Sequence, residues 1–353
     1  MVERVTLPTS RAAIVYQLSC LAVVGCLVVA AANASLAQEP EQGRPALAGK
    51  IYLQASWQTD ENDKSARRSS MIALDPNTGK FVDLGLPGHG PRISPDGKRI
   101  AISLPGAKGN EQATENTYDI HVIDLQSSET LHIAENASVA VWSGDGNRLI
   151  YNVGKMGGDN GEDVGWRGQG RSVLLASKEV RQLGVPKTDE IDDCSADGQW
   201  LVTVSDRHPP LGSGYQLYAM HPDGSHQTRL TDGPGLNCHP RFSPVKNQIV
   251  YHFSRKGVGA LRVVDVDGKN RRELLKSDDG KASPECAAWS PDGKWLAVVR
   301  FDWSIDEKGQ YILSDPADAN YRLEIIDLDG KSLGLVGLDG VSKVTWLGHP
   351  DWR

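Results

Sequence analysis

The stretch AWSPDGKWLAVV at Ala288–Val299 decides the fold, because it encodes two strands joined by a tight turn. Its centre, Ser290–Gly293, matches a type I turn, in which Ser favours the first position, Pro the second and Gly the fourth. The Gly also supplies the positive φ that realigns the chain after the turn. The apolar run Trp295–Val299 is typical of a buried strand. The stretch therefore predicts a strand, a turn and a second strand.

The same phrase occurs five times, which indicates a repeat architecture. The serines that open the turns, at positions 94, 143, 195, 243 and 290, are 47 to 52 residues apart. In the fourth copy Val245-Lys246 replaces Asp-Gly, and Asn247 is predicted to take the left-handed conformation. The first four copies, in chain order, read RISPDGKRIAIS at Arg92–Ser103, VWSGDGNRLIYN at Val141–Asn152, DCSADGQWLVTV at Asp193–Val204 and RFSPVKNQIVYH at Arg241–His252.

Each copy continues with two further predicted strands, as at Leu261–Asp265 and Glu273–Leu275 in the fourth copy. Four antiparallel strands in a unit of this length form one blade of a β-propeller. The five copies therefore predict five blades of an all-β fold.

The two ends of the chain predict a sixth blade. Lys343–Trp346 resembles a first strand without its continuation, whereas Ile51–Ser56, Met71–Asp75 and Phe81–Leu84 resemble the second to fourth strands without a first. Joining them closes the ring and removes the open sheet edge that would otherwise favour aggregation. Trp346 is aligned here with Trp142 and Trp289 of the repeats, and all three are predicted to pack between blades.

The repeats resemble the propeller of the TolB family. The resemblance rests on the Ser-Pro-Asp-Gly turns, on an aromatic residue before the Ser, and on third strands such as Val264–Gly268, and it covers Lys50–Trp352. It implies a six-bladed propeller with four antiparallel strands per blade. Full-length TolB carries a separate α/β domain before the propeller, for which the dozen residues after the predicted signal leave no room. The resemblance therefore does not imply a place in the Tol–Pal machine.

Residues 1–37 predict export from a bacterial cytoplasm. Arg4 and Arg11 precede the apolar run Ala12–Ala32, and Ser35-Leu36-Ala37 is a small-residue cleavage site, which together are typical of a secretory signal. An uncleaved membrane anchor is the alternative, because the run is long for a signal peptide. Residues 38–49 are then a short tether and residues 50–353 the propeller, in the periplasm or cell envelope.

Composition narrows the possible partners and bonds. The formal net charge is −7, from 38 basic and 45 acidic residues, which does not fit a nucleic-acid footprint. After the predicted signal, Cys194, Cys238 and Cys286 remain, and an odd number leaves at least one thiol free. A Cys238–Cys286 bridge is possible, but free thiols are favoured because the registers of the two residues differ by one. Cys194 occupies the aromatic position of its repeat and is predicted to be buried.

Long connections are predicted to gather on one face of the propeller. A set of long segments joins second to third strands, whereas the Ser-Pro-Asp-Gly turns lie opposite. Insertions gather where function varies on a fixed scaffold, so Trp57, Trp166, Arg167 and Trp303 are candidate binding residues. The segments are Trp57–Ser69, Leu104–Thr117, Gly154–Gly170, Asp206–Gly214 and Phe301–Asn320.

Four polar residues are predicted to line the channel mouth on that face: His89, Glu190, His239 and Glu285. Imidazole and carboxylate together suit a metal or an acid–base pair, although a solvated polar funnel is the ordinary lining of a propeller. The preferred hypothesis is a monomeric, non-catalytic module without cofactor that binds an envelope protein or glycan. It contacts the membrane only through an uncleaved N-terminal segment. The alternative is a propeller lyase acting on oligouronates, or another enzyme that uses these four residues as metal ligands.

Overall fold

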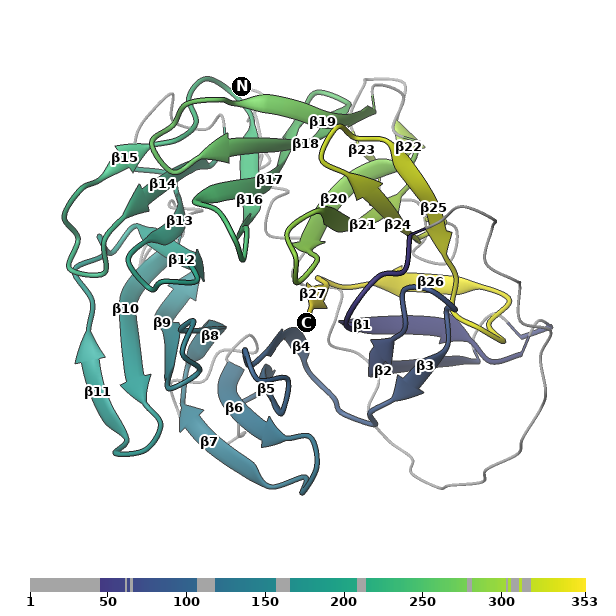
Figure 1. The fold of residues 1–353 in the computed structure, drawn as a ribbon, viewed down its shortest axis with the longest axis horizontal. Helices are drawn as coiled ribbons and strands as arrows, with labels where there is room; N and C mark the ends of the chain where they lie inside the picture. The colour runs from purple at the N-terminus through teal and green to yellow at the C-terminus, as the bar shows by residue number, and fades with distance from the viewer. Residues whose placement is uncertain are drawn as a thin grey trace, which may run out of the picture.

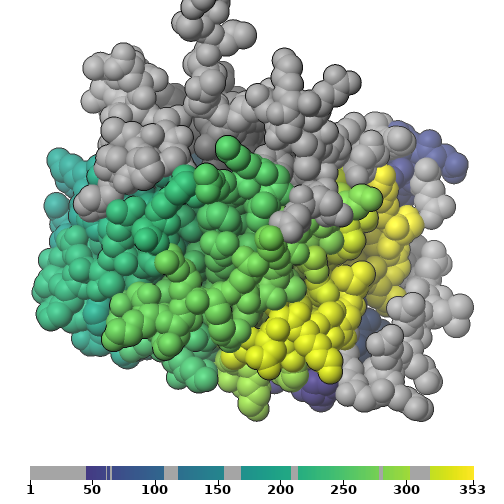
Figure 2. All heavy atoms as spheres, turned by 90° about the horizontal axis from the view of Figure 1, so that it is seen from above, coloured from purple at the N-terminus to yellow at the C-terminus, as the bar shows by residue number. Residues whose placement is uncertain are grey.

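The fold is a closed ring of six β-sheets around a central axis (Figure 1). The computed structural model describes residues 45–60, 62–63, 66–106, 118–156, 166–207, 214–277, 281–302, 304–305, 311–312 and 319–353. The predicted signal and residues 38–44 of the predicted tether lie outside the described residues. Figure 2 shows the ring edge-on, with successive parts of the chain following one another from teal through green to yellow.

Each blade is an antiparallel sheet whose first strand lies nearest the axis. The sheet that joins the chain ends also contains β27 (Asp351–Trp352), and a separate hairpin pairs β22 (Ser304–Ile305) with β23 (Tyr311–Ile312). From the inner strand outward, the sheets are β26 (Val344–Leu347), β1 (Ile51–Gln58), β2 (Arg67–Leu74) and β3 (Phe81–Asp83); β4 (His89–Ile93), β5 (Arg99–Pro105), β6 (Tyr118–Asp124) and β7 (Thr130–Ala134); β8 (Ala137–Trp142), β9 (Arg148–Met156), β10 (Trp166–Leu174) and β11 (Glu179–Gln182); β12 (Asp189–Cys194), β13 (Leu201–Ser205), β14 (Gln216–Met220) and β15 (Thr228–Arg229); β16 (Leu236–Phe242), β17 (Gln248–Arg255), β18 (Val258–Asp265) and β19 (Arg272–Ser277); and β20 (Ser283–Trp289), β21 (Trp295–Phe301), β24 (Arg322–Asp327) and β25 (Ser332–Val336).

The repeated serine organises the turn between the first and second strands of a blade. The Ser290 hydroxyl donates to Asp292 at 2.7 Å and accepts the Trp295 amide at 2.9 Å. Gly293 adopts a φ of 67°, as the turn requires. The fourth copy departs from the prediction, because Asn247 is not among the described residues with positive φ. Without an Asp-Gly pair, the chain there forms an open bend instead.

The residue before each turn serine connects neighbouring blades. Trp142 and Trp289 are buried, and their indole N–H groups donate to the carbonyls of Arg92 and Arg241 in the preceding blades at 2.9 and 3.0 Å. Cys194 is buried at the same position, and its thiol donates to the Trp142 carbonyl at 3.3 Å. The predicted packing of these three residues is confirmed. All three described cysteines are free thiols, so no Cys238–Cys286 bridge forms.

The two ends of the described chain close the ring on β1. Strands β26 and β27 both pair antiparallel with β1, and Lys50 and Arg353 exchange two backbone hydrogen bonds of 2.6 and 3.0 Å. This sheet packs against β20 and β21 on one side through a cluster that contains Ile51 and Trp352. The predicted sixth blade is therefore confirmed.

The predicted alignment of Trp346 is wrong, because Trp352 occupies the position of the repeat tryptophans. Trp352 pairs with Ile51 as Trp289 pairs with Leu296. It is fully buried and donates its indole N–H to the Ala48 carbonyl at 2.8 Å. Trp346 is only half-buried. The alignment failed because β26 and β27 are two parts of one inner strand along β1, separated by residues 348–350. The inner strand therefore extends beyond the four residues of β26.

The residues that the structure describes contain no helix of the length and apolarity needed to span a bilayer.

The closing blade gives a direct test of this register. We expect Trp352→Ala to lower the free energy of unfolding by about 3–5 kcal/mol, the usual cost of truncating a buried Trp. Trp346→Ala is the matched control and should cost clearly less, because Trp346 is half-buried. Denaturant unfolding of both variants measures the difference. A loss from Trp346→Ala as large as that from Trp352→Ala would contradict the register.

Candidate functional site

The central axis is lined by one equivalent residue from each first strand. Most of the first strands shift register just after this position, as between His89 and Arg92 or between Cys238 and Arg241. Such bulges re-aim side chains, and the rings of His239 and His349, from different blades, lie 4.2 Å apart. The equivalent residues are His89, Ser138, Glu190, Cys238, Glu285 and Gly348.

Two of the predicted channel residues are uncharged at neutral pH because protein surrounds them. His89 packs edge-on against Tyr118 at 4.3 Å, and its Nε2 has no hydrogen-bond partner among the described residues. Burial lowers the pKa of His89 to about 4. Burial, together with the negative charge of Asp192, raises the pKa of Glu190 to about 8.

Burial shifts the pKa values of the other two predicted residues in the same directions. It lowers the pKa of His239 to about 4, so this imidazole is neutral, and raises the pKa of Glu285 to about 7, so this carboxyl is partly ionised at neutral pH. The two lie together, because His239 Nδ1 is 3.4 Å from the Glu285 carbonyl oxygen. Burial and the Glu285 charge also raise the pKa of Tyr321. Tyr321 directly follows the long connection of its blade and precedes β24. The channel mouth is therefore polar but largely uncharged.

The structure also shows channel residues that the sequence did not predict as a group. Cys238 Sγ lies 3.7 Å from His239 Nδ1 and 3.6 Å from His252 Nδ1. Cys238 and His252 are Cα partners on β16 and β17, so their pairing across the predicted turn was the available signal. Of the four residues predicted as metal ligands, only His239 belongs to this set of donors. The hypothesis of a metal-dependent lyase therefore remains a prediction.

The predicted aromatic and arginine residues of the loop face have different placements. Trp57 is a core residue, buried at the end of β1 and packed edge-on against Phe81 at 5.6 Å, so its prediction as a surface anchor is wrong. The Gly-rich segment allowed β9 and β10 to extend, and Trp166 and Arg167 pair there with Met156 and Lys155. Trp303 lies outside the described residues.

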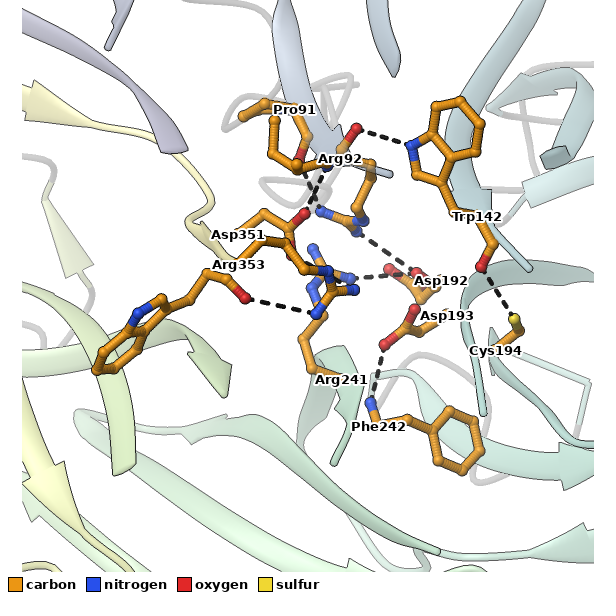
Figure 3. A network of polar contacts seen from close by, with 12 residues as sticks. Pro91, Arg92, Trp142, Asp192, Asp193, Cys194, Arg241, Phe242, Asp351 and Arg353 are labelled. Atoms are coloured by element: carbon orange, nitrogen blue, oxygen red, sulfur yellow. Dashed lines mark hydrogen bonds and ion pairs between the residues drawn. The ribbon is translucent and has the colours of Figure 1, made fainter. Parts of the chain in front are cut away.

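A cavity of about 240 Å³ opens at the opposite end of the axis, among the Ser-Pro-Asp-Gly turns. Arg92 and Arg241 reach into it from β4 and β16 and donate to the Asp192 carbonyl at 3.5 and 3.1 Å (Figure 3). Burial and the nearby charge of Arg241 lower the pKa of Arg92 to about 10.

Carboxylates in the same cavity lie near these arginines and connect blades. Asp193 accepts the Phe242 amide at 2.8 Å, and Asp351 accepts the Ile93 amide at 2.6 Å (Figure 3). Each of these hydrogen bonds crosses from one blade to the next. The charged residues of the cavity thus form a network of hydrogen bonds that joins the first strands of neighbouring blades.

The fold and its axial site define a class, the six-bladed β-propeller whose inner strands line a polar channel. No family model matches the sequence. The chain is 30% identical over 116 residues to an uncharacterized protein of Agrobacterium fabrum, covering 33% of this chain and 36% of that protein. It is 23% identical over 204 residues to the Tol-Pal system protein TolB of Francisella tularensis, covering 57% of this chain and 43% of that protein. The chain thus matches less than half the length of these relatives.

Structural comparison agrees with the repeat pattern. The crystal structure of TolB from Acinetobacter baumannii matches with a TM-score of 0.60 at 17% identity, covering 88% of this chain and 68% of that one. The chain is a TolB-like six-bladed β-propeller.

Glu190 gives a pH test of the uncharged channel. Its folded pKa of about 8 exceeds the ordinary 4.5, so the wild type should lose stability as pH rises through this range. Glu190→Gln removes that dependence. Between pH 5 and pH 8 we expect stability to shift by about 1–2 kcal/mol in favour of the variant. The whole pKa difference would give a larger shift, at ~1.4 kcal/mol per pKa unit. Water that reaches the channel weakens the effect.

Denaturant unfolding at several pH values measures this shift, with Glu129→Gln as an exposed control. A stability difference between wild type and Glu190→Gln that is constant from pH 5 to pH 8 would contradict the uncharged state of Glu190.

Proposed function

We propose that this protein is a non-catalytic, exported binding module that holds a protein or glycan partner over the channel mouth. The observation that carries the proposal is the contact between the channel residues and the ends of the long connections. The His89 ring contacts the Tyr118 ring, and the Glu285 carboxyl lies close enough to Tyr321 to raise the pKa of its hydroxyl. Tyr118 and Tyr321 are the points at which two of these connections re-enter their sheets. A partner bound by the connections therefore reaches the channel.

The distribution of connection lengths supports the choice of face. The segments that join second to third strands include residues 59–66, 106–117, 157–165 and 206–215, whereas the serine turns between first and second strands, on the opposite face, span five or six residues. Long connections on a fixed scaffold are where binding residues concentrate. The charged residues that line the opposite cavity already serve contacts between blades.

The electrostatics of the channel mouth favour a neutral polar ligand. A protonated Glu190 donates a hydrogen bond, and a neutral His89 with an unpartnered Nε2 donates or accepts one, according to its tautomer. Peptide groups and sugar hydroxyls supply matching donors and acceptors. An anionic uronate would instead face carboxyl groups, so its negative charge would need a compensating cation.

The predicted signal and the sequence similarity to the Tol-Pal system protein TolB support a place in the bacterial envelope. A single propeller with a closed ring also fits a monomer, because its sheets leave no unpaired inner edge for a second chain.

The proposal predicts that binding depends on one face only. Trp166→Ala, Arg167→Ala and His89→Ala should each weaken capture of a partner from envelope extracts about 10-fold or more, as loss of an interface anchor does. Lys98→Ala and Lys294→Ala are the matched controls, because both lysines are exposed beside the opposite turns. Pull-down with titrated extract measures the effect. Melting curves establish that each variant is folded.

Equal losses from the two faces, or losses from the lysine variants alone, would exclude the long-connection face as the binding surface.

A further inference from the structure

Three metal-binding side chains converge in the wall of the channel, on the fifth sheet of the ring in chain order. Cys238 lies on β16 and His252 on β17, and their Cα atoms are directly paired. Paired residues of antiparallel strands project to the same side of the sheet. One ligand atom each from Cys238, His239 and His252 lies within 4.8 Å of the others.

The backbone at His239 makes this convergence possible. Adjacent residues of a regular strand point to opposite faces of the sheet, so Cys238 and His239 would normally diverge. His239 instead has a φ of 53° and lies in the bulge where β16 shifts register. Its Nδ1 is consequently 3.7 Å from Cys238 Sγ. The equivalent residues of two other blades, Gly90 and Val139, also have positive φ, at 64° and 47°, so this conformation belongs to the repeated bulge of the first strands.

The two sulfur–nitrogen distances match those of a tetrahedral zinc site. With Zn–S near 2.3 Å and Zn–N near 2.0–2.1 Å, tetrahedral angles place sulfur and nitrogen about 3.6 Å apart. The two Sγ···Nδ1 separations are 3.7 Å to His239 and 3.6 Å to His252. A single thiol proton can serve only one of the two imidazoles, whereas one metal ion can bind the sulfur and both nitrogens together. Metal binding through Nδ1 of His239 would replace the contact that this atom makes with the Glu285 carbonyl oxygen at 3.4 Å.

The surroundings suit a divalent cation. The imidazoles of His239 and His252 coordinate zinc through a neutral ring nitrogen, and Cys238 coordinates it as a thiolate. Binding therefore displaces the Cys238 thiol proton, which passes to solvent. The carboxyl groups of Asp192 and Glu285 lie close enough to Cys238 to interact with its charge, so acidic groups border the site.

We propose that Cys238, His239 and His252 form a zinc-binding site in the channel wall, with the fourth coordination position open toward the axis. The ring of His349 in the closing blade lies 4.2 Å from the ring of His239, tilted by 57°. Three protein ligands with an open position are the arrangement of zinc sites that bind a water or a ligand group. The site thus gives the binding module a metal with which to hold a donor group of its partner. This second role depends on the proposed function, whereas the metal site itself does not.

Among the described residues, a second group of donors provides an internal control. Asp119, His121 and His132 also converge, but they lie on the outer strands β6 and β7, and His132 is exposed. This group contains no sulfur. A thiolate-specific signal therefore reports only on the channel site.

The test is titration of the purified, metal-stripped protein with Co²⁺ and Zn²⁺. Co²⁺ bound to Cys238 should give a thiolate-to-cobalt charge-transfer band together with strong visible bands of tetrahedral cobalt, and one equivalent of Zn²⁺ should abolish both. Cys238→Ser should remove the charge-transfer band, and His252→Ala should weaken Co²⁺ binding about 10–100-fold or more, at least the usual effect of losing a supporting contact in a metal site. Cys286→Ser and His132→Ala should leave the band unchanged.

The controls separate this site from the other thiols and from the surface group. Absence of a charge-transfer band in the wild type, or its persistence in Cys238→Ser, would overturn the proposal. So would loss of the band in Cys286→Ser when that variant melts at the temperature of the wild type. A metal that binds while partner capture in Cys238→Ser stays unchanged would refute only the role in partner binding.

Discussion

The pairing of β1 with β26 and β27 is the constraint on which the rest of the structure depends. It joins residues about 300 positions apart through the mutual hydrogen bonds of Lys50 and Arg353 and the burial of Trp352. Without this pairing β1 would be an open inner edge, which natural sheets avoid. With it, the ring closes, and six first strands are forced around one narrow axis. Closure is also supported by Asp351, which accepts the amide of Ile93 in the next blade.

Closure creates a column of polar side chains that are half-buried between the sheets. Desolvation then sets the charge state along the column, because an isolated charge in such surroundings is costly. Toward the long connections, burial keeps His89 and Glu190 uncharged at neutral pH. Toward the turns, the guanidinium groups of Arg92 and Arg241 lie near carboxylates, and hydrogen bonds of these groups connect the blades (Figure 3). One axis therefore has a polar end of low charge and a charged end, and only the first borders the long connections.

The sequence predicted the architecture because its signals are local. A turn such as Ser290–Gly293 is determined by its own residues, and its repetition reveals the blades. Trp346 was misaligned with the repeat tryptophans because the pairing of the closing strand with β1 is interrupted at residues 348–350. Trp57 was taken for a surface residue because a strand end and a loop start look alike in sequence.

The candidate site was predicted only in part, because its geometry depends on contacts between strands. Spacing from the turn serine identified His89, Glu190, His239 and Glu285 as neighbours of the axis. The same count did not reveal His252, whose relation to Cys238 depends on the register across a hairpin, or the positive φ of His239. A charge state set by burial is likewise a property of the closed ring and of no single segment.

Native-state hydrogen exchange tests the closed ring most directly. The informative amides are those of Lys50 and Arg353 in the closing sheet, compared with Val298 at the centre of β21. If closure holds the ring together, the closing amides should exchange only through global unfolding and show the same free energy of opening as Val298. Exchange of Lys50 and Arg353 through local opening at a much lower free energy, with Val298 still protected, would contradict the account.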